Sequence, residues 1–252
     1  MTREEILKTV EDEGIKFIKM MFVDIKGVAK AIEVTHYLLE SALDNKVTID
    51  GSSVEGMTTV ENSDLILVPD LNSFRRFPIE DSEFGSVAIL MCFVVKPDGT
   101  SADGCVRSVL NKELKNMNGI GFDRMNVGFE PEFFLLRDRA ELLDNGSYAD
   151  TLPSKDGTAH IRHEIMFEFE RCGIIPLTCH HERAPSQCEI TFKYADALRS
   201  CDNLILYKII VEKVAKKHNL IATLEPKPFD GVNGCGLHTN ISLSKDGKKY
   251  LF

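Results

Sequence analysis

Two glutamates lie inside an apolar stretch of this sequence, and they constrain the fold more than any other feature. The stretch covers residues 127–136 and contains Glu130 and Glu132 on either side of Pro131. Residues two apart on a β-strand point to the same face, so a strand here brings both carboxylates together. Burying two like charges on one face is costly unless a cation is shared between them. The pattern therefore predicts a metal ion at this strand.

The composition is that of an ordinary globular protein. Of the 252 residues, 43% are hydrophobic and 27% are charged, and the net charge is -9. An acidic balance argues against a protein that binds the nucleic-acid backbone. The N-terminus lacks the apolar core of a signal peptide, and no apolar run approaches the roughly 20 residues that span a bilayer. We therefore expect a cytoplasmic protein with no nucleic-acid and no membrane partner, whose seven scattered cysteines are reduced.

The first 100 residues or so predict a small, strand-rich N-terminal unit. Thr2 followed by Glu5 matches a capping box that opens a helix ending near Glu13. The other expected elements are a hairpin, a helix and two strands, at residues 17–24 with 28–34, 36–45, 65–68 and 86–95.

The remaining residues predict a second unit in which strands and helices are mixed. Helical patterns cover residues 106–117, 159–171 and 194–218. Strand patterns cover the Glu130 stretch and residues 174–179, 188–192, 220–224 and 237–243. The polar residues 138–157 read as a loop, and a turn at residues 245–247 indicates the start of a last hairpin.

Three further side chains extend the constellation around the two glutamates. Glu182 and Glu189 lie on the two arms of a strand-loop-strand, and His238 follows a glycine-rich loop. Four carboxylates and one imidazole make a hard ligand set that suits Mg²⁺ or Mn²⁺ better than zinc, and two ions could share it.

Simpler interpretations of these residues remain open. Taken singly, Glu182 is also expected of an exposed turn, and His238 of a hydrogen-bonded core histidine. Zinc is the rival metal, because a second set of side chains includes a Cys-x-x-His pair, although it has no Cys-x-x-Cys pair. That set is Cys179, His181, Cys188, Cys235 and His238.

Two segments are rich in small residues. Residues 48–56 hold Asp50 and Ser53 among glycines and serines, a composition that is also common in surface loops. Residues 227–236 carry glycines that let the backbone approach a small ligand, but they lack the Lys and Ser/Thr of a Walker loop.

Together and in this order, the motifs resemble glutamine synthetase of the large bacterial type, from about residue 15 to the end. The motifs are Asp50-Gly51-Ser52-Ser53, Glu130-Pro131-Glu132-Phe133-Phe134, His180-His181-Glu182, Lys193-Tyr194-Ala195-Asp196 and Asn233-Gly234-x-Gly236-x-His238. The resemblance implies an α+β fold: a β-grasp-like domain over residues 1–100, followed by an incomplete antiparallel-sheet catalytic domain over residues 101–252.

The activity implied by the resemblance is ATP-dependent ligation of ammonia to L-glutamate through γ-glutamyl phosphate, a step of nitrogen metabolism. It implies one divalent ion held by Glu132, Glu182 and Glu189, and a second, at the nucleotide phosphates, held by Glu130 and His238. Each ion is Mg²⁺ or Mn²⁺, and both neutralise charge during phosphoryl transfer.

The resemblance also assigns the remaining site residues and the assembly. The catalytic residues at the ammonium site are Asp50, Ser53 and Tyr148; the substrate is bound by Asn233 and Gly234, and the nucleotide by Asn240 and Ser242. Because the loop of Asp50 completes a neighbouring active site in this family, a homo-oligomer with shared sites is implied.

The sequence departs from the family's pattern in three ways. Full-length members continue past Phe252, so we expect this chain alone to be inactive. Leu177 stands where relatives usually place a nucleotide-contacting glutamate, and Arg183 stands beside Glu182, where it could pair with that carboxylate in place of a metal. Two alternatives therefore stay open: a non-catalytic oligomerising or ligand-sensing relative, and a glutamate ligase that uses another amine.

Overall fold

The computed structural model describes residues 1–138 and 141–251. By compactness the chain forms two units, Met1–Gly121 and Phe122–Phe252. The domain boundary near residue 100 stays a prediction. The division by compactness lies further along the chain and places the helix Val106–Gly119 in the first unit. None of the described helices combines the length and apolar character needed to cross a membrane.

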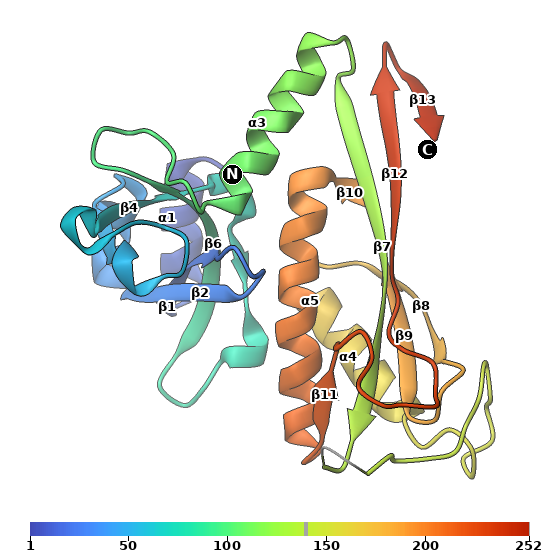
Figure 1. The fold of residues 1–252 in the computed structure, drawn as a ribbon. Coiled ribbons are helices and arrows are strands. Elements are labelled where there is room, and N and C mark those ends of the chain that lie inside the picture. Colours follow the sequence, from blue (N-terminus) through green and yellow to red (C-terminus); the bar gives the residue numbers. More distant parts are fainter. Residues whose placement is uncertain (139–140, 252) are drawn as a thin grey trace. The chain divides into compact units, whose positions relative to one another are not determined.

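The first unit is built from a mixed sheet and three helices, seen in blue to green in Figure 1. Its helices are α1 (Arg3–Asp12), α2 (Leu39–Leu43) and α3 (Val106–Gly119). Its strands are β1 (Ile15–Val23), β2 (Ala29–Thr35), β3 (Val47–Asp50), β4 (Asp64–Pro69), β5 (Arg75–Arg76) and β6 (Ser86–Val95). Short 3-10 turns cover His36–Leu38, Gly51–Ser53, Val60–Asn62, Leu71–Ser73 and Pro78–Glu80.

The first sheet has the order β2-β1-β6-β4-β3, with β5 also beside β6. The predicted capping box is confirmed, since Thr2 Oγ1 accepts a hydrogen bond from the Glu5 amide. The predicted hairpin is confirmed as the antiparallel pair β1 and β2. Strands β1 and β6 run parallel through the middle of the sheet, and their apolar side chains supply much of the core.

Strand β3 was missed by the sequence analysis, which treated residues 48–56 as a loop. Val47 and Ile49 are buried while Thr48 and Asp50 are exposed, which is the alternation of a half-buried strand. The strand has only four residues, and the glycines and serines that follow it hide its short pattern. Its pairing with β4 brings Asp50 to the end of the strand, where the Gly51–Ser53 turn begins.

The second unit consists of a seven-stranded sheet and two helices, seen in light green to red in Figure 1. Its helices are α4 (Ala159–Arg171) and α5 (Ala197–Lys217). Its strands are β7 (Arg124–Leu136), β8 (Pro176–His181), β9 (Gln187–Phe192), β10 (Ala195–Asp196), β11 (Ile221–Thr223), β12 (Leu237–Lys245) and β13 (Lys248–Leu251). The predicted helix over residues 159–171 coincides with α4.

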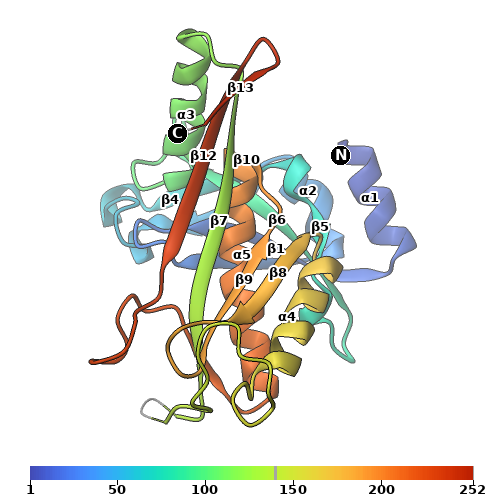
Figure 2. The ribbon, with the colours of Figure 1, turned by 90° about the vertical axis from the view of Figure 1, so that its right-hand side faces the viewer.

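The second sheet is antiparallel, with the order β13-β12-β7-β9-β8, and the long strand β7 is its centre (Figure 2). One face is covered by α4 and α5 through an aromatic cluster, in which the buried ring of Tyr207 contacts Phe133, Phe169 and Phe192. Residues of β7 alternate between this covered face and the opposite face. The opposite face therefore receives Glu130 and Glu132.

Helix α5 begins at Ala197, three residues later than the sequence pattern predicted. Asp196 is its N-cap, and the Asp196 carboxylate accepts a hydrogen bond from the Arg199 amide at 3.1 Å. Ala195 and Asp196 are held in β10 by pairing with β7, so they cannot join the helix. The last hairpin, of which the sequence predicted only the start, is formed by β12 and β13.

Candidate metal centre

Neighbouring strands of the second sheet bring the predicted ligand side chains onto its open face. His238 on β12 lies directly opposite Glu130 on β7. Glu132 lies opposite Glu189 on β9, which in turn lies opposite His180 on β8. Directly opposed residues of antiparallel strands have Cβ atoms about 4.5–5.5 Å apart on the same face. Register alone therefore gathers these side chains into one cluster.

Glu182 joins this cluster from the turn that follows β8. The amide of Arg183 donates to Glu182 Oε2 at 3.0 Å, which fixes the carboxylate in the turn. His180 lies between two carboxylates, with Nδ1 at 3.2 Å from Glu182 Oε1 and Nε2 at 3.6 Å from Glu189 Oε1. His180, Glu182 and Glu189 each offer a ligand atom within 4.8 Å of the others, which is close enough to share one ion.

Within the described residues, the four carboxylates have no Lys or Arg partner. Among residues 1–138 and 141–251, no Lys or Arg nitrogen lies within 4.0 Å of Glu130, Glu132, Glu182 or Glu189. The pKa of Glu189 is raised, first by burial and then by the charges of the other three glutamates, against the opposing effect of His180. The cluster thus holds excess negative charge that a cation would relieve.

The suggestion that Arg183 replaces a metal is wrong. Its side chain is exposed, and within the described part of the chain its guanidinium pairs with no carboxylate. The hydrogen bond between Arg183 and Glu182 is made by the backbone amide of Arg183.

Zinc is also not supported by the geometry. The two groups of described side chains that are close enough to share an ion contain no cysteine. Burial raises the pKa of the Cys188 thiol to about 11 and that of Cys235 to about 12. Oxygen-rich carboxylates fit Mg²⁺ or Mn²⁺.

A glycine leaves room beside one of the glutamates. A Cβ atom added at Gly236 would lie 2.8 Å from Glu132 Oε1 and 3.2 Å from His238 Nε2. The space between the carboxylate and the imidazole is thus kept open by the lack of a side chain. The other oxygen, Glu132 Oε2, accepts from the Gly236 amide at 3.0 Å and from Gln187 Nε2 at 2.6 Å.

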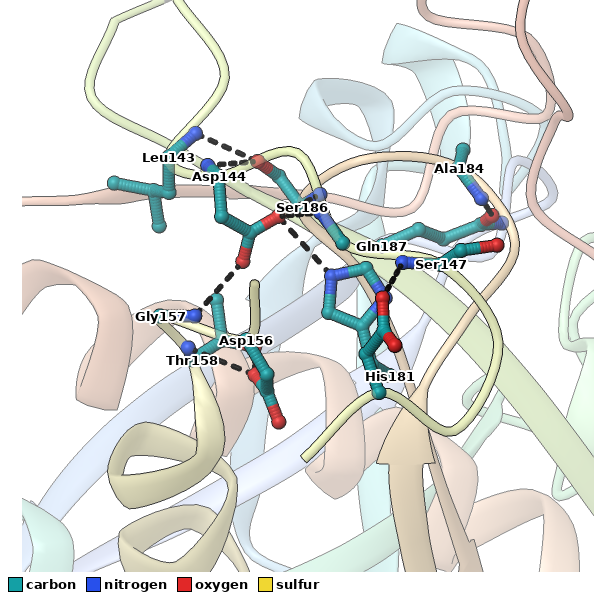
Figure 3. Close-up of polar contacts among 12 residues, drawn as sticks. Leu143, Asp144, Ser147, Asp156, Gly157, Thr158, His181, Ala184, Ser186 and Gln187 are labelled. Atoms are coloured by element: carbon teal, nitrogen blue, oxygen red, sulfur yellow. Dashed lines mark hydrogen bonds and ion pairs between the residues drawn. The ribbon is translucent and has the colours of Figure 1, made fainter. Parts of the chain in front are cut away.

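A second polar network lies around His181, next to Glu182, and Figure 3 shows its contacts. Asp144 Oδ1 accepts from the Ser186 amide at 2.8 Å and contacts His181 Nε2 at 3.1 Å, while Asp144 Oδ2 accepts from the Gly157 amide at 3.1 Å. Burial raises the pKa of Asp144, but these hydrogen bonds outweigh it, so the pKa lies below its usual value. The network ties the loop of residues 141–157 to the turn that carries Glu182.

Asp156 extends this network to helix α4. Its Oδ2 pairs with Arg162 Nη2 at 2.6 Å, and its Oδ1 accepts from the amide and the hydroxyl of Thr158. Burial raises the pKa of Asp156, but the bonds from Arg162 and Thr158 lower it to about 2. Although Asp144, Asp156 and His181 are close enough to share an ion, protein donors already occupy their oxygens. We therefore interpret this group as structural.

The two residues expected at the nucleotide line one cavity. The cavity has a volume of about 420 Å³ and lies over the open face between β12, β7 and β9. Asn240 Nδ2 donates to Glu130 Oε1 at 2.8 Å, and Ser242 is buried at the wall. The ammonium group of Lys249 lies 5.0 Å from the centre of the Tyr194 ring, and Leu177 supplies apolar surface.

Three further expected site residues, Tyr148, Asn233 and Gly234, lie in loops. The Tyr148 ring is 5.2 Å from the His180 ring, and 62% of Tyr148 is exposed. Asn233 lies in the glycine-rich loop, where the carbonyl of Gly234 accepts from Gln187 Nε2 at 2.9 Å.

Asp50 and Ser53 lie in the first unit, at the end of β3. Asp50 Oδ1 accepts from the Ser52 hydroxyl at 2.6 Å, and Oδ2 accepts from the Ser53 hydroxyl at 2.8 Å. These hydrogen bonds hold the pKa of Asp50 below its usual value, so the exposed carboxylate is ionised at neutral pH. Such a carboxylate suits a cationic ligand.

Sequence analysis missed two residues of the site, His180 and Gln187. Each lies two positions before a predicted ligand, Glu182 and Glu189 respectively. The period-2 rule that paired Glu130 with Glu132 would have indicated Gln187, which is on the same strand as Glu189. His180 could not be found this way, because Glu182 lies in the turn beyond β8.

Comparison with known proteins decides the family. A model described as the glutamine synthetase catalytic domain matches residues 103–252, and one described as the glutamine synthetase beta-grasp domain matches residues 14–97. The chain belongs to the glutamine synthetase family. The sequence-based identification and the α+β fold class are therefore confirmed.

Curated relatives agree with this assignment, and solved structures share the fold. The chain is 44% identical to glutamine synthetases of Staphylococcus aureus and Staphylococcus epidermidis, over 100% of its own length and 57% of theirs. Its fold is similar to that of Plasmodium falciparum glutamine synthetase, with a TM-score of 0.89, 23% identity, and coverage of 99% of this chain and 55% of that one. It is also similar to GmaS in a complex with ADP, with a TM-score of 0.86, 27% identity, and coverage of 96% and 56%.

Proposed function

We propose that the whole protein is an ATP-dependent ligase that joins ammonia to L-glutamate and gives L-glutamine. The chain spans 57% of the length of the curated relatives it matches, so this activity is proposed for the whole protein. The observation that carries the proposal is a cluster of carboxylates at the open face of the second sheet. Glu130 lies opposite His238 and Glu132 lies opposite Glu189 on neighbouring strands, and Glu182 joins Glu189 from the adjoining turn.

Within this cluster the cross-strand pairs suggest two neighbouring cation sites. Glu132, Glu182 and Glu189 would hold one Mg²⁺ or Mn²⁺, since Glu132 and Glu189 are directly opposed and Glu182 adjoins Glu189. Glu130 and His238 are directly opposed and would contribute to the second. When bound, such ions neutralise phosphate charge and orient the reacting oxygens.

The reaction then needs positioning more than covalent help from the protein. The terminal phosphoryl group of ATP passes to the γ-carboxylate of glutamate; ammonia attacks the resulting acyl carbon, and phosphate leaves. Asn240 and Ser242, on the wall of the 420 Å³ cavity beside Glu130, would hold the nucleotide. Asn233 and Gly234 would hold the amino-acid end of glutamate, at the edge of the same sheet face.

Ammonium is proposed to meet Asp50, Ser53 and Tyr148. The ionised Asp50 carboxylate, held by serine hydroxyls, suits binding and deprotonation of a small cation. In the proposed assembly, a cytoplasmic homo-oligomer, the Asp50 loop of one subunit completes the site of its neighbour.

Calorimetric titration with Mn²⁺ tests the cation sites in the chain itself. The wild-type chain is expected to bind Mn²⁺, and Gly236→Ala to bind it at least tenfold more weakly, because the added methyl fills the space beside Glu132 and His238. Gly157→Ala is the matched control, since its Cβ meets only ordinary contacts at 3.7 Å or more. A wild-type chain that binds no Mn²⁺ would overturn the proposal.

The same titration separates the ligase from a non-catalytic relative, which would have lost the ion sites. Glutamine formation from ATP, glutamate and ammonium, compared with methylamine as the alternative amine, tests the substrate. The same assay tests the prediction that the 252 residues alone are inactive. Glutamine formation by this chain alone would contradict that prediction.

A further inference from the structure

The amide of Gln187 joins three parts of the site that are far apart in the sequence. Gln187 is fully buried at the start of β9. Its Nε2 donates to Glu132 Oε2 at 2.6 Å and to the Gly234 carbonyl at 2.9 Å. Its Oε1 accepts from the Ala184 amide at 3.1 Å, a contact drawn in Figure 3.

These partners fix the orientation of the side-chain amide without ambiguity. The Ala184 amide can only donate, so it must face the oxygen of Gln187, and the Gly234 carbonyl can only accept, so it must face the nitrogen. The second hydrogen on that nitrogen therefore points to Glu132, which must accept it. An amide with all of its nearby partners satisfied is held in one rotamer.

This arrangement distinguishes the two oxygens of Glu132. Oε2 is occupied by two donors, Gln187 Nε2 and the Gly236 amide. Oε1 faces the space that a Cβ atom at Gly236 would fill, beside His238 Nε2. The protein thus binds Oε2 of the Glu132 carboxylate, and Oε1 faces the space beside Gly236 and His238.

The same amide holds the glycine-rich loop. Gln187 binds the Gly234 carbonyl, and the loop is also closed by the Cys235 amide, which donates to the Pro226 carbonyl at 3.0 Å. A Cβ atom at Gly234 would lie 2.1 Å from that carbonyl oxygen, so the closure requires glycine there. Gln187 thus joins Glu132 to the Gly234 carbonyl, in addition to the direct hydrogen bond that Glu132 accepts from the Gly236 amide.

We propose that Gln187 is a positioning residue that turns Glu132 Oε1 toward the cation and couples that carboxylate to the loop of Gly234. The inference rests on the proposed function, in which Glu132 binds the ion and Gly234 binds the substrate. Gln187 itself contacts neither the ion nor the substrate, because its amide hydrogens and its oxygen are bonded to protein groups. It acts through the two elements that it joins.

The experiment compares Gln187→Met, which keeps the length but loses the amide, with Gln187→Asn, which keeps the amide but loses the reach. Ser200→Ala is the matched control. The buried Ser200 hydroxyl also joins two backbone groups, since it donates to the Val127 carbonyl on β7 and accepts from the Ala195 amide on β10, away from the ligands. Mn²⁺ affinity is measured by calorimetry, and hydrogen exchange of the Cys235 and Gly236 amides is measured in the metal-free chain.

Both Gln187 variants are expected to bind Mn²⁺ about tenfold more weakly, since loss of outer-shell partners costs about 10–100-fold in metal affinity. Exchange of both loop amides is expected to be several-fold faster in these variants, and Ser200→Ala should change neither quantity. Metal affinity within twofold of wild type, or unchanged exchange, in a folded Gln187 variant overturns the inference. A wild-type chain that binds no Mn²⁺ overturns the proposed function instead, and the exchange rates of the metal-free variants still decide the role of Gln187.

Discussion

Two carboxylates of the second unit, Asp156 and Glu189, differ in how their charge is balanced. Asp156 is 7% exposed and is saturated by Arg162 and Thr158, so its charge is balanced inside the protein. Among the described residues, the imidazole of His180 is the one basic group paired with Glu189, against three other glutamates, so the charge of Glu189 is not balanced. At the residue scale, donors supplied by the chain distinguish a structural carboxylate from one that is available to a cation.

Substitution of Asp156 should reveal this difference as a pH dependence of stability. The pKa of Asp156 is about 2 in the folded chain and near 3.8 when unfolded, so its contribution is complete above pH 4 and is lost as the pH falls toward 2. Each pKa unit corresponds to about 1.4 kcal/mol, which makes the contribution about 2 kcal/mol. Asp156→Asn should therefore unfold more easily than wild type at pH 7 and approach it near pH 2, as measured by urea titration.

The exposed Asp246 provides the control for this measurement. Asp246→Asn should leave the free energy of unfolding close to that of wild type at every pH, since Asn tolerates the left-handed backbone there. An Asp156→Asn difference that stays constant from pH 7 to pH 2 would contradict the assignment.

At the scale of elements, strand β7 accommodates a proline in the middle of a sheet. Pro131 has no N–H to donate, which normally excludes proline from a central strand. Here pairing with β12 ends at Pro131, and pairing with β9 begins at Glu132. The Pro131 carbonyl accepts from the buried hydroxyl of Tyr207 on α5 at 3.1 Å. Helix α5 thus contacts β7 at Pro131, between the two ligand glutamates Glu130 and Glu132.

Tyr207→Phe should weaken this connection while keeping the aromatic cluster. We expect a loss of about 1 kcal/mol in the free energy of unfolding, because a buried carbonyl loses a hydrogen-bond partner. The exposed Tyr250 is the control, since Tyr250→Phe removes a hydroxyl that solvent can replace. Equal stabilities of the two variants in urea titrations followed by circular dichroism would show that the Tyr207 bond contributes nothing.

Helices and strands whose apolar residues repeat over many positions were predictable from the sequence. Element bounds that depend on pairing with a distant strand were not. Helix α4 has a long apolar period, and its predicted bounds coincide with those observed. Strand β3 is too short to show its period, and the start of α5 depends on β10 pairing with β7.

The candidate site shows the same division. Glu130 and Glu132 stood out because charge inside an apolar strand is itself a signal. The contacts of Gln187 depend on groups up to 55 residues away, and no local pattern contains them. Assignment of the ligand residues to particular ions remains a prediction from the family resemblance.

At the scale of the whole molecule, the two compact units should respond differently to a cation. All five proposed ligands belong to the second unit, and Asp50 and Ser53 belong to the first. Mn²⁺ at about 100 times its Kd should stabilise the folded second unit by about 2.7 kcal/mol. Hydrogen exchange with and without Mn²⁺ should show slower exchange in β7, β9 and β12, and little change in the first unit.

Glu189→Gln keeps the shape of the side chain but removes its charge, so it should lose most of this protection. Protection that persists in Glu189→Gln, or that appears only in the first unit, would contradict the location of the cation site.

The long separation between β7 and β12 has a consequence for how the protein is made. The Gly236 amide that holds Glu132 is supplied 104 residues later in the chain. On the ribosome, β7 therefore emerges well before its β12 neighbour, and one edge of a hydrophobic strand has no partner during that interval. The ion-binding face can be completed only after β12 has been synthesised. We therefore expect each chain to bind its metal late in synthesis and folding.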